Sequence, residues 1–182
     1  MPNSDASPDG IDFVTALARL LQSGTLRDEF VANAAGVSRR LGVRPSDREM
    51  FLQLAPVELE AQAVVLLRKR FDLVRRWLAR TCRSLGNEAW PMFQAYSRTT
   101  WPQAKSHAAN DAKGFCAMID ANRPAALCRI EFHRVHFLCG ENRWSVCFLH
   151  AVPVRPGFRP GLQIFLRHRR GRWHEWVIFA GA

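Results

Sequence analysis

The stretch that decides the fold class is 143–152, Arg143-Trp144-Ser145-Val146-Cys147-Phe148-Leu149-His150-Ala151-Val152. It is rich in aromatic and β-branched residues, a composition typical of a β-strand. Similar stretches occur at 129–139, 162–169 and 173–179. The connections between them are short and rich in turn residues: Gly140-Glu141-Asn142, 153–161 and Arg170-Gly171-Arg172. We therefore predict a four-stranded antiparallel β-meander at the C-terminus.

The residues upstream follow a helical period. Residues 11–42 predict two short helices, separated at Gly24 and ended by Gly42, because glycine is the preferred residue after a helix. Ser46, followed by Glu49 three residues later, matches a capping box and predicts a short helix as far as Leu54.

The longest predicted helix begins at Pro56 and runs to about Leu85. One set of its residues has the spacing of a buried apolar stripe: Leu67, Phe71, Val74 and Leu78. A second set forms a separate basic stripe: Lys69, Arg76, Arg80 and Arg83. Gly86-Asn87 ends this helix and caps an aromatic-rich one. A last helix is expected over about 105–121.

These elements indicate an α+β protein, an N-terminal helical bundle followed by the antiparallel sheet. We expect a disordered lead-in at 1–10, a helical domain at 11–122 and a sheet domain at 123–182. A small sheet buries too little surface to be stable alone, so one of its faces should pack on the helices.

Net charge is spread unevenly along the chain. The total is +10. Residues 1–57 carry −1, residues 58–122 carry +4, and residues 123–182, with ten arginines against three glutamates, carry +7. Such a field favours an anionic partner, either nucleic acid or an acidic polypeptide. Arginine in place of lysine suits bidentate contact with carboxylate or phosphate.

Cysteine usage and hydropathy indicate a cytoplasmic protein without a membrane span. The cysteines are odd in number and form no close pair: Cys82, Cys116, Cys128, Cys139 and Cys147. Their apolar neighbours predict buried thiols in a reducing compartment, the last three on strands. No apolar run approaches the length of a membrane-spanning helix.

The sequence offers no catalytic signature, so we expect no enzyme, cofactor or metal. The strongest candidate for a metal site is the segment from Glu131 to His136, which contains an acidic residue and two histidines, His133 and His136. In a strand, His133 and His136 would point to opposite faces, and Glu131 with His133 alone would give too few metal ligands. The other strand histidines are isolated: His150, His168 and His174.

The functional prediction therefore rests on the residues expected at the surface. The predicted C-terminal hairpin combines clustered cations with two tryptophans: Arg167, Arg169, Arg170, Arg172, Trp173 and Trp176. Cations beside aromatic rings suit phosphates and bases, and equally suit an acidic peptide with an apolar anchor. Because the tryptophans are three residues apart, one should face the core and the other should be available. A sheet edge could also accept a peptide as an added strand.

One region resembles a known family. It comprises Leu66-Leu67-Arg68-Lys69-Arg70-Phe71-Asp72-Leu73-Val74 and Leu85-Gly86-Asn87-Glu88-Ala89-Trp90-Pro91-Met92-Phe93-Gln94-Ala95-Tyr96. These segments resemble a family of helical domains catalogued as DNA-binding, in which a long helix leads to a Gly-Asp/Asn-Glu turn and an aromatic-rich helix. The likeness covers about 60–120. Residues 13–54 resemble small modules of the nitrogen-fixation-leader type.

The resemblance implies a role in the modification of ribosomally made peptides. Similar proteins act as partners of multinuclear non-heme iron-dependent oxidases, as in the methanobactin pathway, and bring the precursor peptide to the oxidase. By this likeness the chain is a non-catalytic partner in a heterodimer with an iron-dependent oxidase. The peptide-binding residues would be Arg167, Arg169, Arg170, Arg172 and Trp173. The oxidase-facing residues would be Lys69, Arg76, Arg80 and Arg83.

Two alternatives remain open at this point. The charge and the name of the resembling family favour a nucleic-acid-binding protein or transcriptional regulator, although the sequence contains no compact helix-turn-helix pattern. A metal-dependent enzyme would need His133, His136 and other strand histidines to converge on one site.

Overall fold

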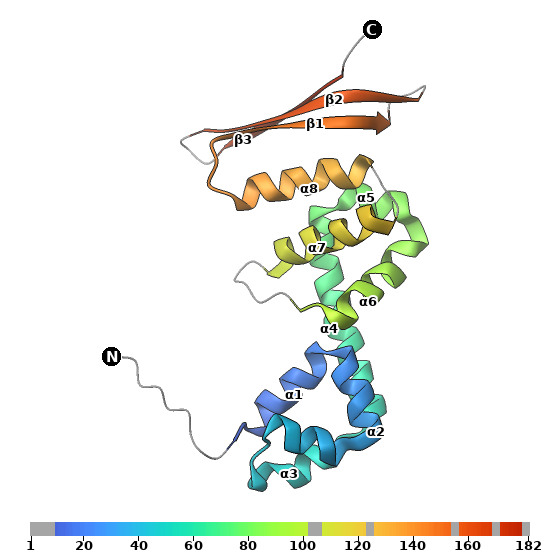
Figure 1. Ribbon diagram of the computed structural model, residues 1–182, viewed down its shortest axis with the longest axis vertical. Coiled ribbons are helices and arrows are strands. Elements are labelled where there is room, and N and C mark those ends of the chain that lie inside the picture. The colour runs from blue at the N-terminus through green and yellow to red at the C-terminus, as the bar shows by residue number, and fades with distance from the viewer. Residues whose placement is uncertain (1–9, 102–106, 123–125, 154–156, 169–171, 180–182) are drawn as a thin grey trace, which may run out of the picture. The chain divides into compact units, whose positions relative to one another are not determined.

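The computed structural model describes residues 10–101, 107–122, 126–153, 157–168 and 172–179, and Figure 1 shows their secondary structure. The chain divides into two compact units. The first contains the residues up to Lys69 together with Ser97–Trp101, and the second contains Arg70–Tyr96 together with the residues from Pro102 on. This division differs from the predicted boundary at 122. The predicted lead-in at 1–10 lies outside the described residues, apart from Gly10.

The first unit is helical, as predicted. Its helices are α1 (Phe13–Gln22), α2 (Gly24–Leu41, kinked at Asn33), α3 (Pro45–Leu52) and the beginning of α4 (Pro56–Trp77). They enclose an apolar core made of Ala16, Leu20, Phe30, Val37, Val43, Phe51 and Leu59. Ile11 and Val43 form a short parallel bridge beside this core.

Local signals fix most helix ends in this unit. Ser23 ends α1 and caps α2, its hydroxyl accepting from the Leu26 N–H at 3.2 Å. Gly42 adopts the left-handed conformation after α2 (φ 67°), as predicted. The predicted capping box at Ser46 is wrong. The helix begins one residue earlier, at Pro45, because proline's fixed φ suits the first helical position.

The long predicted helix is broken at Leu78. The segments on either side are α4 and α5 (Ala79–Leu85), and Leu78 between them has non-helical angles (φ −118°, ψ 43°). The predicted apolar stripe is confirmed nonetheless, since Leu67, Phe71, Val74 and Leu78 are all buried.

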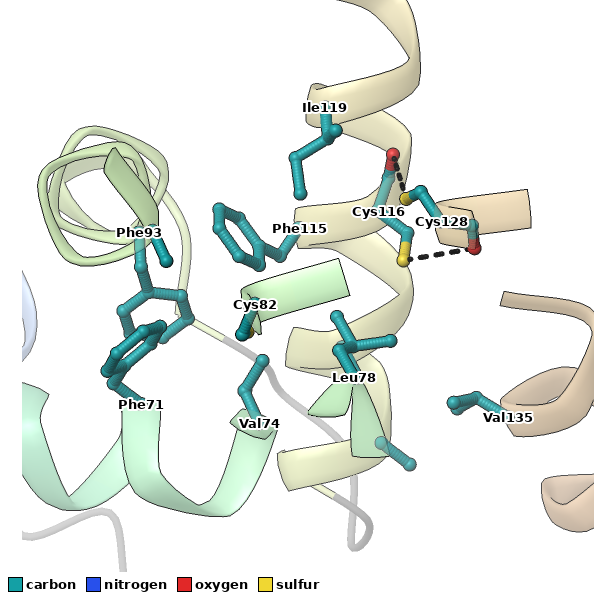
Figure 2. Close-up of a cluster of buried hydrophobic side chains, with 13 residues drawn as sticks. Phe71, Val74, Leu78, Cys82, Phe93, Phe115, Cys116, Ile119, Cys128 and Val135 are labelled. Carbon is teal, nitrogen blue, oxygen red and sulfur yellow. Dashed lines mark hydrogen bonds between the residues drawn. The ribbon is translucent and has the colours of Figure 1, made fainter. Parts of the chain in front are cut away.

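The second unit has its main core between the end of α4, α5 and the helices that follow α5. These are the short 3-10 helix η1 (Gly86–Glu88), α6 (Ala89–Thr99), α7 (His107–Asn122) and α8 (Ala126–Cys139). Figure 2 shows the core side chains, with the Phe93 and Phe115 rings edge to face at 5.4 Å. Arg70 forms a bidentate ion pair with Asp111 (2.6 and 2.9 Å) beside this cluster.

The first predicted strand, 129–139, is wrong: these residues lie in α8. The helix is apolar on two sides. Cys128 and Val135 pack in the core formed with α5 and α7, while Ile130 and Phe137 contact the sheet. A helix buried on both sides has no clear polar face, so its helical period is hidden and its composition resembles that of a buried strand.

The sheet is a three-stranded antiparallel meander, not the predicted four-stranded one, in the order β1-β2-β3. The strands are β1 (Trp144–Pro153), β2 (Phe158–Arg167) and β3 (Trp173–Phe179). In Figure 1, α8 runs along one face of the sheet and separates it from α5 and α7. The predicted packing of the sheet on helices is therefore observed, with α8 as the covering layer.

Candidate binding surface

Side chains alternate between the two faces of each strand, and the face toward α8 is well packed. Leu149 and Val152 of β1 join Ile130 of α8 in a small core. The rings of Phe137 on α8 and Phe165 on β2 stack at 4.9 Å. These contacts define the inner face of the sheet, and the side chains at its centre are buried as in a protein core.

A polar network also joins the inner face to α8. Arg134 on α8 donates two hydrogen bonds to the Glu175 carboxylate on β3, at 2.7 and 3.0 Å. The side-chain amide of Gln163, which is fully buried on β2, donates to the same carboxylate (2.9 Å) and to the Ile130 carbonyl (3.0 Å). Because these bonds join β2 and β3 to α8, they fix the position of this helix along the sheet.

Arg167, a predicted peptide-binding residue, is engaged within the protein. Its guanidinium donates to the carbonyls of Phe137, Leu138 and Gly140 at 2.7 to 3.1 Å, and it lies 5.0 Å from the centre of the Phe137 ring. A cation at a helix C-terminus satisfies carbonyls that have no partner within the helix. The geometry therefore gives Arg167 a structural role, as the cap of α8.

The outer face of the sheet is a continuous apolar surface, formed by three cross-strand rows. The strand register sets the rows: Trp144, Leu166 and His174; Val146, Ile164 and Trp176; Phe148, Leu162 and Ile178. We call these residues the outer face. A single histidine supplies its polar group, and the ring of His174 stacks on Trp176 at 5.5 Å.

Most of the outer face is open to solvent. The exposed fractions are 67% for Trp144, 59% for Phe148 and 45% for Trp176. Strands that are apolar on both faces are normally covered on both faces. Here α8 covers one face only, so the other presents large side chains without a covering element among the described residues. An exposed apolar patch of this kind is typical of a surface that binds another molecule, which makes the outer face a candidate binding surface.

The structure describes only some of the other residues of the predicted hairpin. Arg169 and Arg170 lie outside the described residues. Arg172 and Trp173 are exposed at the start of β3. Trp173 and Trp176 do lie on opposite faces, as predicted, but neither is buried: they are 39% and 45% exposed. Of the predicted peptide-binding residues that the structure describes, Arg172 and Trp173 are thus accessible.

The candidate metal ligands take other roles. In α8, His133 and His136 are three residues apart and lie near each other, not on opposite faces, and both rings contact Phe132. Burial lowers the pKa of His133, and the neighbouring His136 lowers it further. The Glu131 carboxylate is buried and accepts from backbone N–H groups of α5. Within the described ranges, no three histidine, cysteine or acidic side chains are close enough to hold a metal ion.

The cysteines agree only in part with the prediction. Cys82, Cys116 and Cys128 are buried, but Cys128 belongs to α8 and not to a strand. Cys139, also in α8, is exposed because it lies in the last turn, and Cys147 on β1 is half-buried. Cys116 and Cys128 form hydrogen bonds with each other. These bonds and burial raise the pKa of Cys116, so its thiol is protonated at neutral pH. It is not an activated nucleophile.

The predicted oxidase-facing residues are all exposed. Lys69 falls in the first unit, and Arg76, Arg80 and Arg83 fall in the second. Arg76 lies near the end of α4, whereas Arg80 and Arg83 lie on α5, beyond the break at Leu78. The basic stripe expected on one straight helix is thus divided between two helices.

Comparison of the chain with protein-family models, with curated proteins and with solved structures gives no match. In the described part of the chain, no single helix is both long and apolar enough to cross a membrane. Only α3 and α4 taken together, with a 91° bend between them, meet that criterion of length and composition.

The sequence predicted the three strands together with a fourth at 129–139 that is helical, and it did not reveal the outer face. The signal was present: β1 and β2 have large apolar residues at consecutive positions and not only at alternate ones, as in Val146-Cys147-Phe148-Leu149. Such runs indicate strands that are apolar on both faces. Without the register, these residues could not be grouped into one surface.

Proposed function

We propose that this chain is a non-catalytic partner protein and that it binds a polypeptide through the outer face of its sheet. The observation that carries the proposal is the row of Val146, Ile164 and Trp176, part of an apolar sheet face with no covering element among the described residues. Exposing these side chains to water is unfavourable, by roughly 25 cal/mol for each Å² of apolar surface, so a partner that covers them gains that free energy.

The charges around the outer face favour an acidic partner. Residues 123–182 carry a net charge of +7. Arg143 precedes β1 and Arg172 precedes β3, both exposed beside the row that contains Trp144. Complementary charge at the rim steers association, while aromatic side chains at the centre supply affinity. The partner we propose is a polypeptide segment with apolar side chains for the sheet and acidic residues for the rim.

The narrower form of the proposal comes from the family resemblance, which covers about 60–120. In that form the polypeptide is the leader of a ribosomally made precursor peptide, and the chain presents it to an iron-dependent oxidase. The exposed arginines Arg76, Arg80 and Arg83 are then the candidate contacts with the oxidase, together with Lys69. Support for this form is the resemblance, together with the net charge of +7 on residues 123–182, which favours an acidic peptide.

A pull-down with matched variants tests the proposal. The bait is the tagged full-length chain in three forms: wild type, Trp176→Glu on the outer face, and Val57→Glu. Val57 is 82% exposed at the start of α4, so its replacement adds the same charge outside the unit that contains the sheet. Co-eluting proteins and peptides are identified by mass spectrometry, and iron is measured in the eluate.

The proposal predicts that a stoichiometric partner co-elutes with wild type and Val57→Glu and is lost with Trp176→Glu. An acidic peptide and an iron-containing protein in the eluate support the narrower form. Recovery of nucleic acid that is released by salt, equally by all three baits, contradicts the proposal and favours a nucleic-acid-binding protein.

A further inference from the structure

The second unit contains a basic hollow beside the break between α4 and α5. Its volume is about 810 Å³, within the range of small-molecule sites. Its basic side chains come from Arg75 and Arg76 at the end of α4 and from Arg83 on α5. The break at Leu78 changes the course of the chain between them, which lets three arginines from two helices line one space.

The hollow has an excess of positive charge. Three arginines line it against one acidic residue, Asp72, which leaves two positive charges. Asp72 pairs with Arg75 at 3.6 Å. Arg76 and Arg83 form no ion pair with the residues that the structure describes, and both are exposed. Guanidinium groups in this state are available for bidentate bonds to an anion.

The charge balance favours a phosphomonoester over a carboxylate. A phosphomonoester carries about −1.5 to −2 at pH 7, which matches the excess of the hollow, whereas a carboxylate would neutralise half of it. The Cys82 thiol in the wall adds no negative charge, since burial raises its pKa to about 11.

The rest of the wall is apolar and aromatic. Trp90 on α6 is half-buried and lines the hollow beside Phe71, 5.5 Å away between ring centres. An indole face beside cationic groups is suited to stacking against a planar ring. The Asn87 side chain, at the turn before α6, lies on the same wall and can donate and accept hydrogen bonds.

We propose that this hollow binds a mononucleotide, with Arg76 and Arg83 on the phosphate and Trp90 against the base. The hollow shares no residue with the outer face of the sheet, so this proposal and that of polypeptide binding at the outer face can fail independently, although Arg76 and Arg83 also belong to the candidate oxidase contacts. Because none of the lining residues forms a catalytic constellation, the site is one of binding.

Calorimetric titration of the full chain with adenosine 5′-monophosphate tests this proposal. Inorganic phosphate and adenosine serve as separate probes of the two halves of the ligand. The variants are Arg76→Gln and Arg83→Gln, and the matched control is Arg80→Gln. Arg80 lies one turn from Arg83 on α5, is equally exposed, and does not line the hollow. All three substitutions remove the same charge from an exposed position, so folding is preserved.

The expected result is that adenosine 5′-monophosphate binds wild type at least about 10-fold more tightly than either phosphate or adenosine alone. Arg83→Gln and Arg76→Gln each weaken binding about 10-fold or more, the effect of losing a charge-assisted hydrogen bond, and Arg80→Gln weakens it less than about 2-fold. Absence of binding at millimolar ligand overturns the proposal, and so does an equal loss in all three variants. A single-stranded oligoadenylate that binds far more tightly, with the same dependence on Arg83, overturns the assignment to a free mononucleotide.

Discussion

The buried Glu131 carboxylate of α8 accepts hydrogen bonds from the backbone N–H of Thr81, at 2.8 Å, and from that of Arg80, at 2.9 Å. These N–H groups belong to the first turn of α5 and have no partner within that helix. The residue at the N-cap position, Leu78, has no side-chain acceptor. A side chain some 50 residues away in the sequence thus replaces a local cap.

Replacement of Glu131 should destabilise the protein without affecting any metal content. Glu131→Ala leaves two N–H groups of α5 unpaired, one buried and one partly buried, and we expect a loss of about 2 kcal/mol in the free energy of unfolding. Glu131→Gln, which retains one acceptor oxygen, should lose about half as much. Urea denaturation followed by circular dichroism measures both, with the exposed Glu141→Ala as the control. A loss no larger than that of the control would show that the cap is not formed.

Arg167 should contribute to the stability of the fold, whereas Arg172, on the same hairpin, should not. Arg167→Ala removes hydrogen bonds to three carbonyls at the end of α8, and we expect a loss of about 2 kcal/mol in unfolding free energy. Arg172→Ala, at an exposed position, should change stability by less than about 0.5 kcal/mol. Thermal denaturation of the two variants gives the comparison. Equal stability of both would mean that the Arg167 guanidinium is free to bind a partner.

Burial of His133 should make stability depend on pH. Its pKa is lower in the folded protein than its ordinary value of 6.5, so below that pH the unfolded chain binds more protons and the folded state is disfavoured. The free energy of unfolding should therefore fall as the pH is lowered from about 7.5 to about 5.5. His133→Gln should reduce this fall most, and His136→Gln, which removes only the smaller contribution of a neighbouring charge to the lowered pKa of His133, should reduce it less. Identical pH profiles for wild type and His133→Gln would contradict the assignment.

The ion pair between Arg134 and Glu175 should couple α8 to β3. Both side chains are mostly buried, with 22% and 13% of their surfaces exposed. Removing one partner leaves the other charge poorly solvated, so Arg134→Met and Glu175→Gln should each destabilise the protein by about 2 kcal/mol. A double-mutant cycle should give a coupling of at least about 1 kcal/mol. Additive effects in the double variant would show that the two residues act independently.

The type of a secondary-structure element can be predicted from the sequence when the element is buried on one face only. The apolar stripe from Leu67 to Leu78 has a polar opposite side, and its helical period was therefore visible. The segment 129–139 has apolar contacts on two sides, with the helices through Val135 and with the sheet through Phe137. Its period is hidden for that reason, and only the tertiary structure distinguishes it from a strand.

The candidate surfaces were predictable only in part. Composition alone drew attention to the cations and tryptophans around 167–176, but it could not show that Arg167 is used by the end of α8. That bond depends on where α8 ends relative to β2. Likewise, the spacing of Arg76 and Arg83 predicts one stripe on a straight helix. The hollow that they share with Arg75 exists because the helix breaks at Leu78.

Site-specific photocrosslinking tests the binding role of the outer face most directly. A photoreactive phenylalanine derivative is placed at Phe148, at Trp176 or, as the control, at Val57, and crosslinks are formed in the native host. Binding of a polypeptide at the outer face predicts that derivatives at Phe148 and Trp176 crosslink to the same acidic polypeptide and that the derivative at Val57 does not. Crosslinks only to a second copy of this chain, or the same products from all three positions, would contradict it.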